Sequence, residues 1–377
     1  MKNKIWLSSP HMGGTEQNYV KEAFDTNWIA PLGPNVTIFE EMLKLELKDE
    51  TREIACLSSG TAAIHLSLIL ADVGMGDEVL CQSFTFSASA NPIVYQGATP
   101  LFIDSEKQTW NMCPIHLEKA IKDRILKGVK PKAIIVVHLY GMPAKIDEIA
   151  FIAKKYNITL IEDAAEALGS KLNAQKCGTF GDFGILSFNG NKIITTSGGG
   201  ALVCKNKEIK EKAIFLSTQA RDNAPHYQHS NIGYNYRMSN VLAGIGRGQM
   251  EVLEERVNQR RANQTFYKNL FKEYIDVKVF EEPSSNFFSN YWLTTILLPT
   301  YKDRERLRLF LENENIESRP LWKPMHLQPV FKNYPYYGDA IAESLFERGL
   351  CLPSGSNLTD DDKNRIKKAI SHFLNSI

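Results

Sequence analysis

The chain contains 377 residues, of which 43% are hydrophobic and 23% are charged. These fractions are typical of a soluble globular protein and exclude a disordered or fibrous chain. The formal net charge is +1, so we expect no general attraction to nucleic acid or to an anionic membrane. At roughly 150 residues per domain, this length predicts about two domains.

The cysteines and the hydropathy pattern favour a reducing, cytoplasmic location. No two cysteines form a C-x-x-C pair, so we expect free thiols and no metal site. No segment approaches the ~20 apolar residues of a membrane span, and the apolar stretch near the N-terminus is too short for a signal-peptide core. The cysteines are Cys56, Cys81, Cys113, Cys177, Cys204 and Cys351.

Short apolar runs alternate with helical periodicity through the first three-fifths of the chain. Helical periodicity is clear in 61–72 and 145–156. This alternation predicts an α/β fold with a mainly parallel sheet that helices cover on both sides. The predicted strands are Glu53–Ser58, Glu78–Gln82, Thr99–Ile103, Lys132–His138, Ile158–Glu162, Phe183–Phe188 and Gly200–Cys204.

The pattern changes after a long helix predicted over Ser239–Phe271. Strands follow at Tyr291–Leu298 and Ile316–Arg319, with a helix over Lys302–Asn313 between them. A closing helix is predicted over Thr359–Leu374, with Thr359 and Asp360 as capping candidates. We therefore predict a large domain over residues 1–250 and a smaller α+β domain over 251–377.

Lys192 is the first candidate for chemistry, in the stretch SFNGNKIITTSGGG. A lone lysine is most often a solvated surface residue. Here an apolar strand precedes it and a glycine run follows it, which allows close approach of backbone or ligand. A lysine in a tight, partly desolvated place can attack a carbonyl, as a Schiff base with pyridoxal phosphate (PLP) requires.

Asp163 ends an apolar run, in ITLIEDAAEALG. It could cap a helix beginning at Ala164, or it could pair with the pyridinium nitrogen of PLP and keep the ring an electron sink. Glu162 should point to the opposite face of the strand. Glu166 could reach the phenolic oxygen of the cofactor, or be an acid favoured by the dipole of a helix start.

A phosphate site is predicted where a strand gives way to a helix at Ser58–Thr61. Free N–H groups at a helix start attract anions, and the hydroxyl of Ser59 or Thr61 can add a bond. Plain helix capping explains the same residues equally well. Ser187 could contact the phosphate from another strand. Phe86 could stack on a flat ring or pack in the core.

In order, these parts resemble the DegT/DnrJ-type sugar-nucleotide aminotransferases, which have the fold-type I PLP architecture. The resemblance extends over nearly the whole chain and is closest to the UDP-4-amino-4,6-dideoxy-N-acetylglucosamine transaminases. The matching stretches are NWIAPLGPNVTIFEE, LSSGTAAIHLSL, QSFTFSASANPI, HLYGMPAKIDEI, IEDAAEALGS, SFNGNKIITTSGGG, GYNYRMSN and RPLWKPMH.

The resemblance implies a role for each matching residue. Lys192 would carry the cofactor, and Asp163 would pair with its ring nitrogen. Asn235 would reach the phosphate from a neighbouring subunit, which implies a homodimer with shared sites. Glu166 stands where many relatives have Gln or His. The remaining implied cofactor contacts are Ser59, Gly60, Thr61 and Ser187 at the phosphate and Phe86 at the ring.

Substrate contacts are predicted in SRPLWKPMH. Arginine and lysine suit a diphosphate, and tryptophan can cover a planar group, although a proline-stiffened loop that packs on the other domain fits equally well. His138, which ends an apolar strand, has a structural interpretation. The substrate candidates are His11, Arg237, Arg319, Trp322, Lys323 and His326.

The resemblance implies amino transfer from L-glutamate, through the pyridoxamine phosphate form, to C4 of a nucleotide-linked 4-keto-6-deoxy sugar. The expected substrate is UDP-2-acetamido-2,6-dideoxy-4-ketohexose, for bacillosamine-type glycan synthesis. The alternatives are a C3 aminotransferase on a dTDP-ketosugar and a regulator that binds without turnover. Lys192 disfavours a dehydratase, where the family typically has histidine. A nicotinamide enzyme would need a G-x-G-x-x-G turn, which is missing after the first strand.

Overall fold

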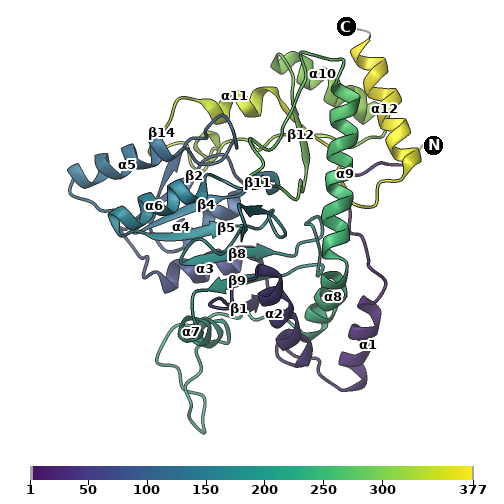
Figure 1. Cartoon of the computed structure of the whole chain (residues 1–377). Helices are drawn as coiled ribbons and strands as arrows, with labels where there is room; N and C mark the ends of the chain where they lie inside the picture. The colour runs from purple at the N-terminus through teal and green to yellow at the C-terminus, as the bar shows by residue number, and fades with distance from the viewer. Residues whose placement is uncertain (1–2, 376–377) are drawn as a thin grey trace.

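The computed structural model describes residues 3–375 and has an α/β architecture (Figure 1). Its central sheet has eight strands within these residues, in the order β1-β9-β8-β5-β4-β2-β3-β14. The strands are β1 (Glu53–Leu57), β2 (Glu78–Gln82), β3 (Thr99–Ile103), β4 (Ala133–Val137), β5 (Thr159–Asp163), β8 (Phe183–Ser187), β9 (Gly200–Cys204) and β14 (Tyr336–Tyr337). All seven predicted strands are present, with ends shifted by one residue at most.

Most of the sheet is parallel, as predicted. β9 lies antiparallel between β1 and β8, and the other neighbouring pairs are parallel. β1 and β8 therefore run in the same direction as β5, β4, β2 and β3. Their carboxyl ends share one edge of the sheet, where parallel α/β folds bind ligands.

Helices cover both faces of the sheet because its strands are apolar on both sides. In β1, Ala55 and Leu57 join one core cluster, whereas Ile54 and Cys56 join another, as the two-residue period of a strand requires. α3 and α7 contribute to the first cluster, α2 and α8 to the second, and α5 and α6 to a third. These helices are α2 (Pro34–Leu47), α3 (Gly60–Leu70), α5 (Pro114–Leu126), α6 (Ile146–Tyr156), α7 (Lys207–Ser217) and α8 (Asn240–Glu251).

A second, smaller sheet has the order β10-β12-β15-β13 and packs with the helices that end the chain. The domain boundary at residue 250 stays a prediction, and two segments lie across it. Ile5 pairs with Ile316, and β14 joins the central sheet beside β3. The elements are β10 (Lys278–Val279), β12 (Thr294–Leu297), β13 (Arg319–Pro320), β15 (Gly349–Leu352), α9 (Leu253–Phe271), α10 (Tyr301–Asn313), α11 (Ile341–Arg348) and α12 (Asp360–Leu374).

The helix predicted over Ser239–Phe271 is wrong as a single element. It consists of α8 and α9, which are separated at Val252, where φ is −113° and ψ is 7°. This non-helical residue lets α8 pack against α1 and α2 while α9 leads to the second sheet (Figure 1). The remaining elements are α1 (Glu16–Asp25), α4 (Asn91–Tyr95), β6 (Lys171–Leu172), β7 (Gln175–Lys176) and β11 (Phe287–Phe288).

The six cysteines are buried and free of disulfide bonds in the described residues, as expected for a reducing environment. Burial raises the pKa of the Cys204 thiol to about 12 and that of the Cys113 thiol above its usual value, which leaves both protonated at neutral pH. Between residues 3 and 375, no helix combines the length and the apolar character that crossing a membrane requires.

Thr359→Ala should lower the free energy of unfolding by about 1 kcal/mol. The Thr359 hydroxyl accepts from the Asp362 N–H, and the Asp362 carboxylate accepts from the Thr359 N–H, which completes a capping box. Of the two capping candidates, Thr359 is the N-cap, whereas Asp360 is the first residue of the helix. Urea unfolding measures the loss, with Thr265→Ala on an exposed face of α9 as the control. Equal effects of the two changes would contradict this account.

Candidate active site

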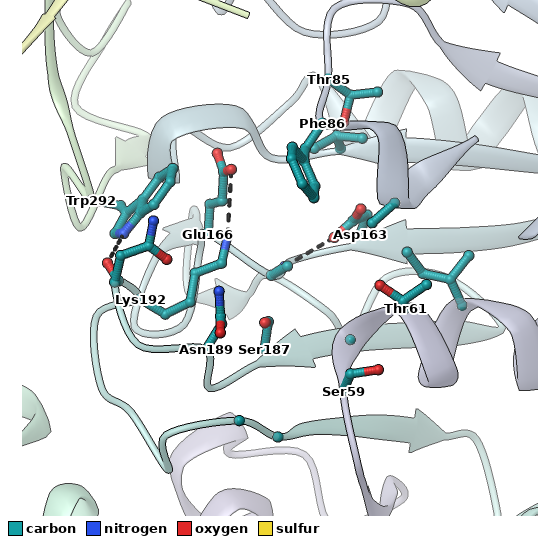
Figure 2. A pocket seen from close by; sticks show the side chains of 18 of the residues that line it. Ser59, Thr61, Thr85, Phe86, Asp163, Glu166, Ser187, Asn189, Lys192 and Trp292 are labelled. Carbon is teal, nitrogen blue, oxygen red and sulfur yellow. Dashed lines mark hydrogen bonds and ion pairs between the residues drawn. The ribbon is translucent and has the colours of Figure 1, made fainter. Parts of the chain in front are cut away.

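A cavity of about 320 Å³ opens at the carboxyl edge of the central sheet. Ser59 follows β1, Asp163 ends β5 and Ser187 ends β8, so separate strands deliver their last residues to one place. In Figure 2, Lys192, Glu166 and Trp292 lie together on one side, and Ser59 and Thr61 lie on the other. The lining residues are Ser58, Ser59, Gly60, Thr61, Ile64, Thr85, Phe86, Ala88, Val137, Asp163, Ala165, Glu166, Ser187, Asn189, Asn191, Lys192, Gly198, Gly199, Trp292 and Trp322.

The start of α3 forms one end of the cavity. Ser59 is its N-cap, and the Ser59 Oγ accepts from the Ala62 N–H at 3.0 Å. The first turn of a helix leaves N–H groups without helical partners, and the helix dipole favours negative charge there. Capping and anion binding are therefore compatible at Ser59, because the capped N–H is only one of those in the turn.

Asp163 is held by hydrogen bonds and is almost fully buried, with 5% of its surface exposed. Its Oδ2 accepts from the Ser89 Oγ at 2.6 Å, and Ser89 in turn contacts the Thr85 Oγ1 at 2.9 Å. Its Oδ1 accepts from the Ala165 N–H at 3.1 Å. The chain forms turns after Asp163, so the alternative of a helix that begins at Ala164 is wrong, and the carboxylate caps a turn.

Lys192 lies inside the cavity, so the interpretation as a solvated surface lysine is wrong. Its side chain is 14% exposed, and its Nζ lies 3.5 Å from the Glu166 Oε1. The same Nζ lies 4.3 Å from the centre of the Trp292 ring. A carboxylate and an aromatic face both attract an ammonium group, so the ε-amine has a defined resting position.

Glu166 is a buried acid anchored from both sides. Its Oε2 accepts from the Tyr140 N–H at 2.7 Å, which leaves Oε1 for Lys192. Burial raises the pKa of the Glu166 carboxyl, and the charge of Lys192 opposes that rise. The alternative in which Glu166 stabilises a helix start is wrong, because this segment forms turns. Glu162, as predicted, faces the other way, where its Oε2 contacts the His138 Nε2 at 3.0 Å.

Two aromatic rings form the roof of the cavity. Phe86 follows β2 and is 52% exposed, so the interpretation of Phe86 as a core residue is wrong. The centre of its ring lies 5.4 Å from that of Trp322. The backbone N–H of Trp322 donates a hydrogen bond to the Tyr140 hydroxyl at 2.9 Å, which positions this residue. These rings leave a flat ligand room beneath them.

Sequence reasoning missed several lining residues. Trp292 lies 100 residues from Lys192, and its Nε1 donates to the Asn191 carbonyl at 2.7 Å, a contact with no local sequence signal. Ser89 and Thr85 belong to a serine-rich stretch after β2, which was a usable signal for hydroxyl partners of an acid. Asn189 and Asn191 flank the glycine of the Lys192 loop.

Most predicted substrate residues lie outside the cavity of the single chain. Arg237 pairs with Glu40 at 2.5 Å, and Arg319 pairs with Glu317 at 2.6 Å. The His11 Nδ1 contacts the Ser356 hydroxyl at 3.1 Å. Trp322 is the predicted substrate residue that lines the cavity.

The remaining predicted residues have other surroundings. His326 contacts the Ser83 hydroxyl at 2.6 Å and Glu343 at 3.2 Å, and Lys323 is half-buried in the same loop. Asn235 is exposed and pairs with Thr218 outside the cavity. His138 is fully buried and links β4 to β5 through Glu162, which supports its structural interpretation.

Comparison with known proteins identifies the family. Residues 10–371 match the model of the DegT/DnrJ/EryC1/StrS aminotransferase family. The chain belongs to this family. Among curated proteins, it is 51% identical to EpsN of Bacillus subtilis (strain 168), provisionally named a pyridoxal phosphate-dependent aminotransferase, over all of the chain and 97% of that protein. It is 37% identical to a GDP-perosamine synthase of Escherichia coli O157:H7, over 98% of each.

A solved relative connects the family to its cofactor. Spr1654 of Streptococcus pneumoniae, a provisionally assigned sugar aminotransferase, is 25% identical, and 99% of each chain is covered. Its PLP-form has a TM-score of 0.90 and its PMP-form one of 0.89. The protein is therefore a PLP-dependent aminotransferase of nucleotide-linked sugars with the fold-type I architecture.

The residues around the cavity fit that cofactor. A buried carboxylate, Asp163, suits a protonated ring nitrogen, and the start of α3 suits a phosphate. Lys192 is the lysine that lines the cavity in the described chain. β9 needs a residue without a side chain where it passes the start of α3, because a Cβ on Gly200 would lie 2.4 Å from the Gly60 nitrogen.

Gly200→Ala should displace the start of α3, lower stability by roughly 1–3 kcal/mol and weaken cofactor binding. Gly190→Ala is the control, because a Cβ there meets nothing within 4 Å. Urea unfolding of the cofactor-free protein and equilibrium dialysis with PLP measure the two effects. Unchanged PLP affinity in Gly200→Ala would show that the close approach of β9 is unimportant for the phosphate end.

Proposed function

We propose that this enzyme transfers the amino group of L-glutamate to C4 of a UDP-linked 4-keto-6-deoxy sugar, UDP-2-acetamido-2,6-dideoxy-4-ketohexose. Lys192 and Asp163 are the catalytic residues. The observation that carries the proposal is the position of the Lys192 Nζ, held between Glu166 and Trp292 in the cavity that also contains Asp163. We place the reaction in the cytoplasm, in bacterial glycan synthesis of the bacillosamine type.

Lys192 has two roles in this proposal. It holds the cofactor covalently between turnovers, and bound PLP supplies an electron sink for the carbanion at the substrate carbon. Once the donor amine has replaced it, the Lys192 Nζ would move a proton from the donor Cα to C4′ of the cofactor. In the second half the same amine would move a proton from C4′ to C4 of the sugar. One amine can serve both halves because its release makes it a general base.

The other residues of the cavity bind the cofactor or position the Lys192 Nζ in this proposal. The Asp163 carboxylate, fixed by Ser89, would accept a hydrogen bond from the ring nitrogen of bound PLP. Phe86 would cover the ring, and Glu166, which holds the Lys192 Nζ, would face the phenolic oxygen. The phosphate contacts are Ser59, Gly60, Thr61 and Ser187.

Asn235 supports the proposal of a homodimer with shared sites. It lies outside the cavity of its own chain and closes the loop that projects below α7 (Figure 1). Large apolar side chains are also exposed on and after α1, including Phe24, Trp28 and Leu32. An exposed apolar patch marks an interaction surface. In the proposed dimer, a second copy would cover these apolar side chains. Asn235 of one chain would reach the proposed phosphate site of the other chain.

The nucleotide is the part of the proposal with a second candidate. The names of relatives cover GDP-perosamine synthases, a dTDP-sugar 4-aminotransferase of Saccharopolyspora spinosa and a UDP-sugar 3-aminotransferase of Acidithiobacillus ferrooxidans. Three GDP-perosamine synthases, 34–37% identical to this chain, favour a GDP-linked keto sugar as the alternative. Trp322 at the cavity, with the cations Arg237, Arg319 and Lys323 and the imidazoles His11 and His326, is our proposal for the nucleotide side.

An assay with L-glutamate and a panel of UDP-, GDP- and dTDP-linked keto sugars tests this function. We expect release of 2-oxoglutarate and an amino group at C4 of the UDP-sugar, with the position read by NMR. Lys192→Ala should lower turnover by roughly 100- to 10,000-fold and abolish borohydride-stable attachment of PLP.

The exposed Lys205 provides the control, since Lys205→Ala should change neither turnover nor attachment. Amination of the GDP-sugar alone would replace the UDP proposal with the second candidate. Full turnover by Lys192→Ala would refute the catalytic assignment, whichever sugar is accepted.

Mixed dimers of Lys192→Ala and Asn235→Ala chains test the shared site. Each proposed site combines Lys192 of one chain with Asn235 of the other, so each parent dimer has two defective sites. In a hybrid dimer one site carries both substitutions and the other carries neither. Differently tagged chains allow the hybrid to be purified. We expect it to bind PLP at one site with wild-type affinity and to turn over, whereas the Asn235→Ala parent binds PLP weakly. A hybrid whose Lys192-containing site binds PLP as weakly as the Asn235→Ala parent would place Asn235 in its own chain's site.

A further inference from the structure

Arg260 is a buried cation without a carboxylate partner. It lies on α9 with 1% of its surface exposed, and among residues 3–375 no acidic group lies within ion-pair distance of it. Burial and the nearby Arg256 lower the pKa of Arg260 to about 9, so it keeps its charge at neutral pH. A buried charge without a counter-ion is destabilising unless its N–H groups find hydrogen-bond acceptors. The acceptors of Arg260 therefore indicate its role.

The guanidinium of Arg260 holds the backbone of Lys192 itself and of Trp292, whose ring faces the Lys192 Nζ. Its Nη1 donates to the Trp292 carbonyl at 2.5 Å, and its Nη2 donates to the Lys192 carbonyl at 3.4 Å. Nη1 also reaches the Ser354 carbonyl at 3.3 Å. A single rigid fork therefore connects the Lys192 loop, the segment before β12 and the segment after β15.

A second set of contacts closes the arrangement. The Arg260 Nη2 donates to the Ser8 Oγ at 3.0 Å, and that hydroxyl donates to the Asn191 carbonyl at 2.9 Å. The Asn191 carbonyl also accepts from the Trp292 Nε1 at 2.7 Å. The peptides on both sides of the Lys192 Cα are thus fixed from behind, while the side chain extends into the cavity on the other side.

We propose that Arg260 is a positioning residue that fixes the peptide of Lys192 and the ring of Trp292 in one register, so that the ε-amine enters the cavity at the cofactor. The proposal rests on the assignment of Lys192 as the cofactor-binding lysine. Charge-assisted hydrogen bonds to carbonyls are stronger than neutral ones. The planar fork of an arginine can serve four segments at once, as Arg260 does through Lys192, Trp292, Ser354 and Ser8. A hydrophobic residue of the same size would remove the hydrogen bonds of Arg260 to the Trp292 and Lys192 carbonyls, whereas the Ser354 carbonyl would keep the Asn263 side-chain amide as a donor.

The test compares Arg260→Gln and Arg260→Lys with Arg256→Gln. Arg256 lies one turn earlier on α9 and is also buried, at 3% exposure, but it donates to the Met12 carbonyl and pairs with Glu255. It contacts neither Lys192 nor Trp292, so it reproduces the loss of a buried arginine from the same helix. Arg260→Lys keeps the charge and loses the fork, which provides a folded variant if Arg260→Gln fails to fold.

The first measurement is the rate at which Lys192 becomes covalently attached to added PLP in the full chain, with samples reduced by borohydride and mapped by mass spectrometry. Misplacement of a reacting group by about 1 Å can slow a reaction roughly 100-fold. We expect a loss of that order in Arg260→Gln and a smaller loss in Arg260→Lys at saturating PLP. Arg256→Gln should attach PLP at the wild-type rate.

The second measurement is amide hydrogen exchange of the cofactor-free full chain, which does not depend on the role of Lys192. Exchange should rise in residues 189–194 and 291–293 of the Arg260 variants and stay unchanged there in Arg256→Gln. Wild-type exchange in the Arg260 variants, or an equal rise in Arg256→Gln, would overturn the proposal. Attachment at the wild-type rate in both Arg260 variants would do the same. Wild-type protein without attachment at Lys192 would instead refute the proposed function.

Discussion

The shared direction of β1, β5 and β8 is the constraint on which the site depends. Each strand is short and buried. β5 ends in Asp163 and β8 in Ser187, and Ser59 follows β1 closely at the same edge of the sheet. Residues more than a hundred positions apart, such as Ser59 and Ser187, therefore meet without any long-range interaction of their own. The antiparallel β9 completes this edge, and Gly200 lets it pass against the start of α3. Backbone geometry thus builds the end of the cavity that we propose for the phosphate.

The charges in the cavity are kept in separate pairs. The nearest carboxylate to the Lys192 Nζ is Glu166, at 3.5 Å, whereas Asp163 is held by a serine hydroxyl and a backbone N–H. This separation matters because a direct pair between Lys192 and Asp163 would neutralise both groups and would occupy the acceptor that a ring nitrogen needs. Glu166 therefore explains how a cation and a second acid coexist in one small cavity. The Gln or His expected at this position in many relatives would hold the lysine without a negative charge.

Local sequence patterns predicted the elements and site residues whose positions depend on neighbouring residues in the chain. The strands and the residues at their ends followed from apolar runs and turn signals, because each run needs only to be buried on both faces. Trp292 and Arg260 were not predictable in this way, since the residues of the Lys192 loop to which they donate are 101 and 68 positions away in the chain. The break at Val252 was also missed, because the sequence remains helical in character on both sides and only packing against α1 and α2 separates the two helices.

In the proposed function, the loop that carries Trp322 serves the nucleotide side and is separate from the residues that act on the amino group. Lys192 and Asp163 lie on the central sheet and its loops, whereas Trp322 lies on the segment after β13 and is fixed by Tyr140. His326 ties the same loop to Ser83, just after β2, and to Glu343 on α11. A substitution in this loop can therefore move the ring over the substrate and leave Lys192 and Asp163 in place. We infer that this division lets members of one family act on sugars carried by different nucleotides while the amino-transfer end stays unchanged.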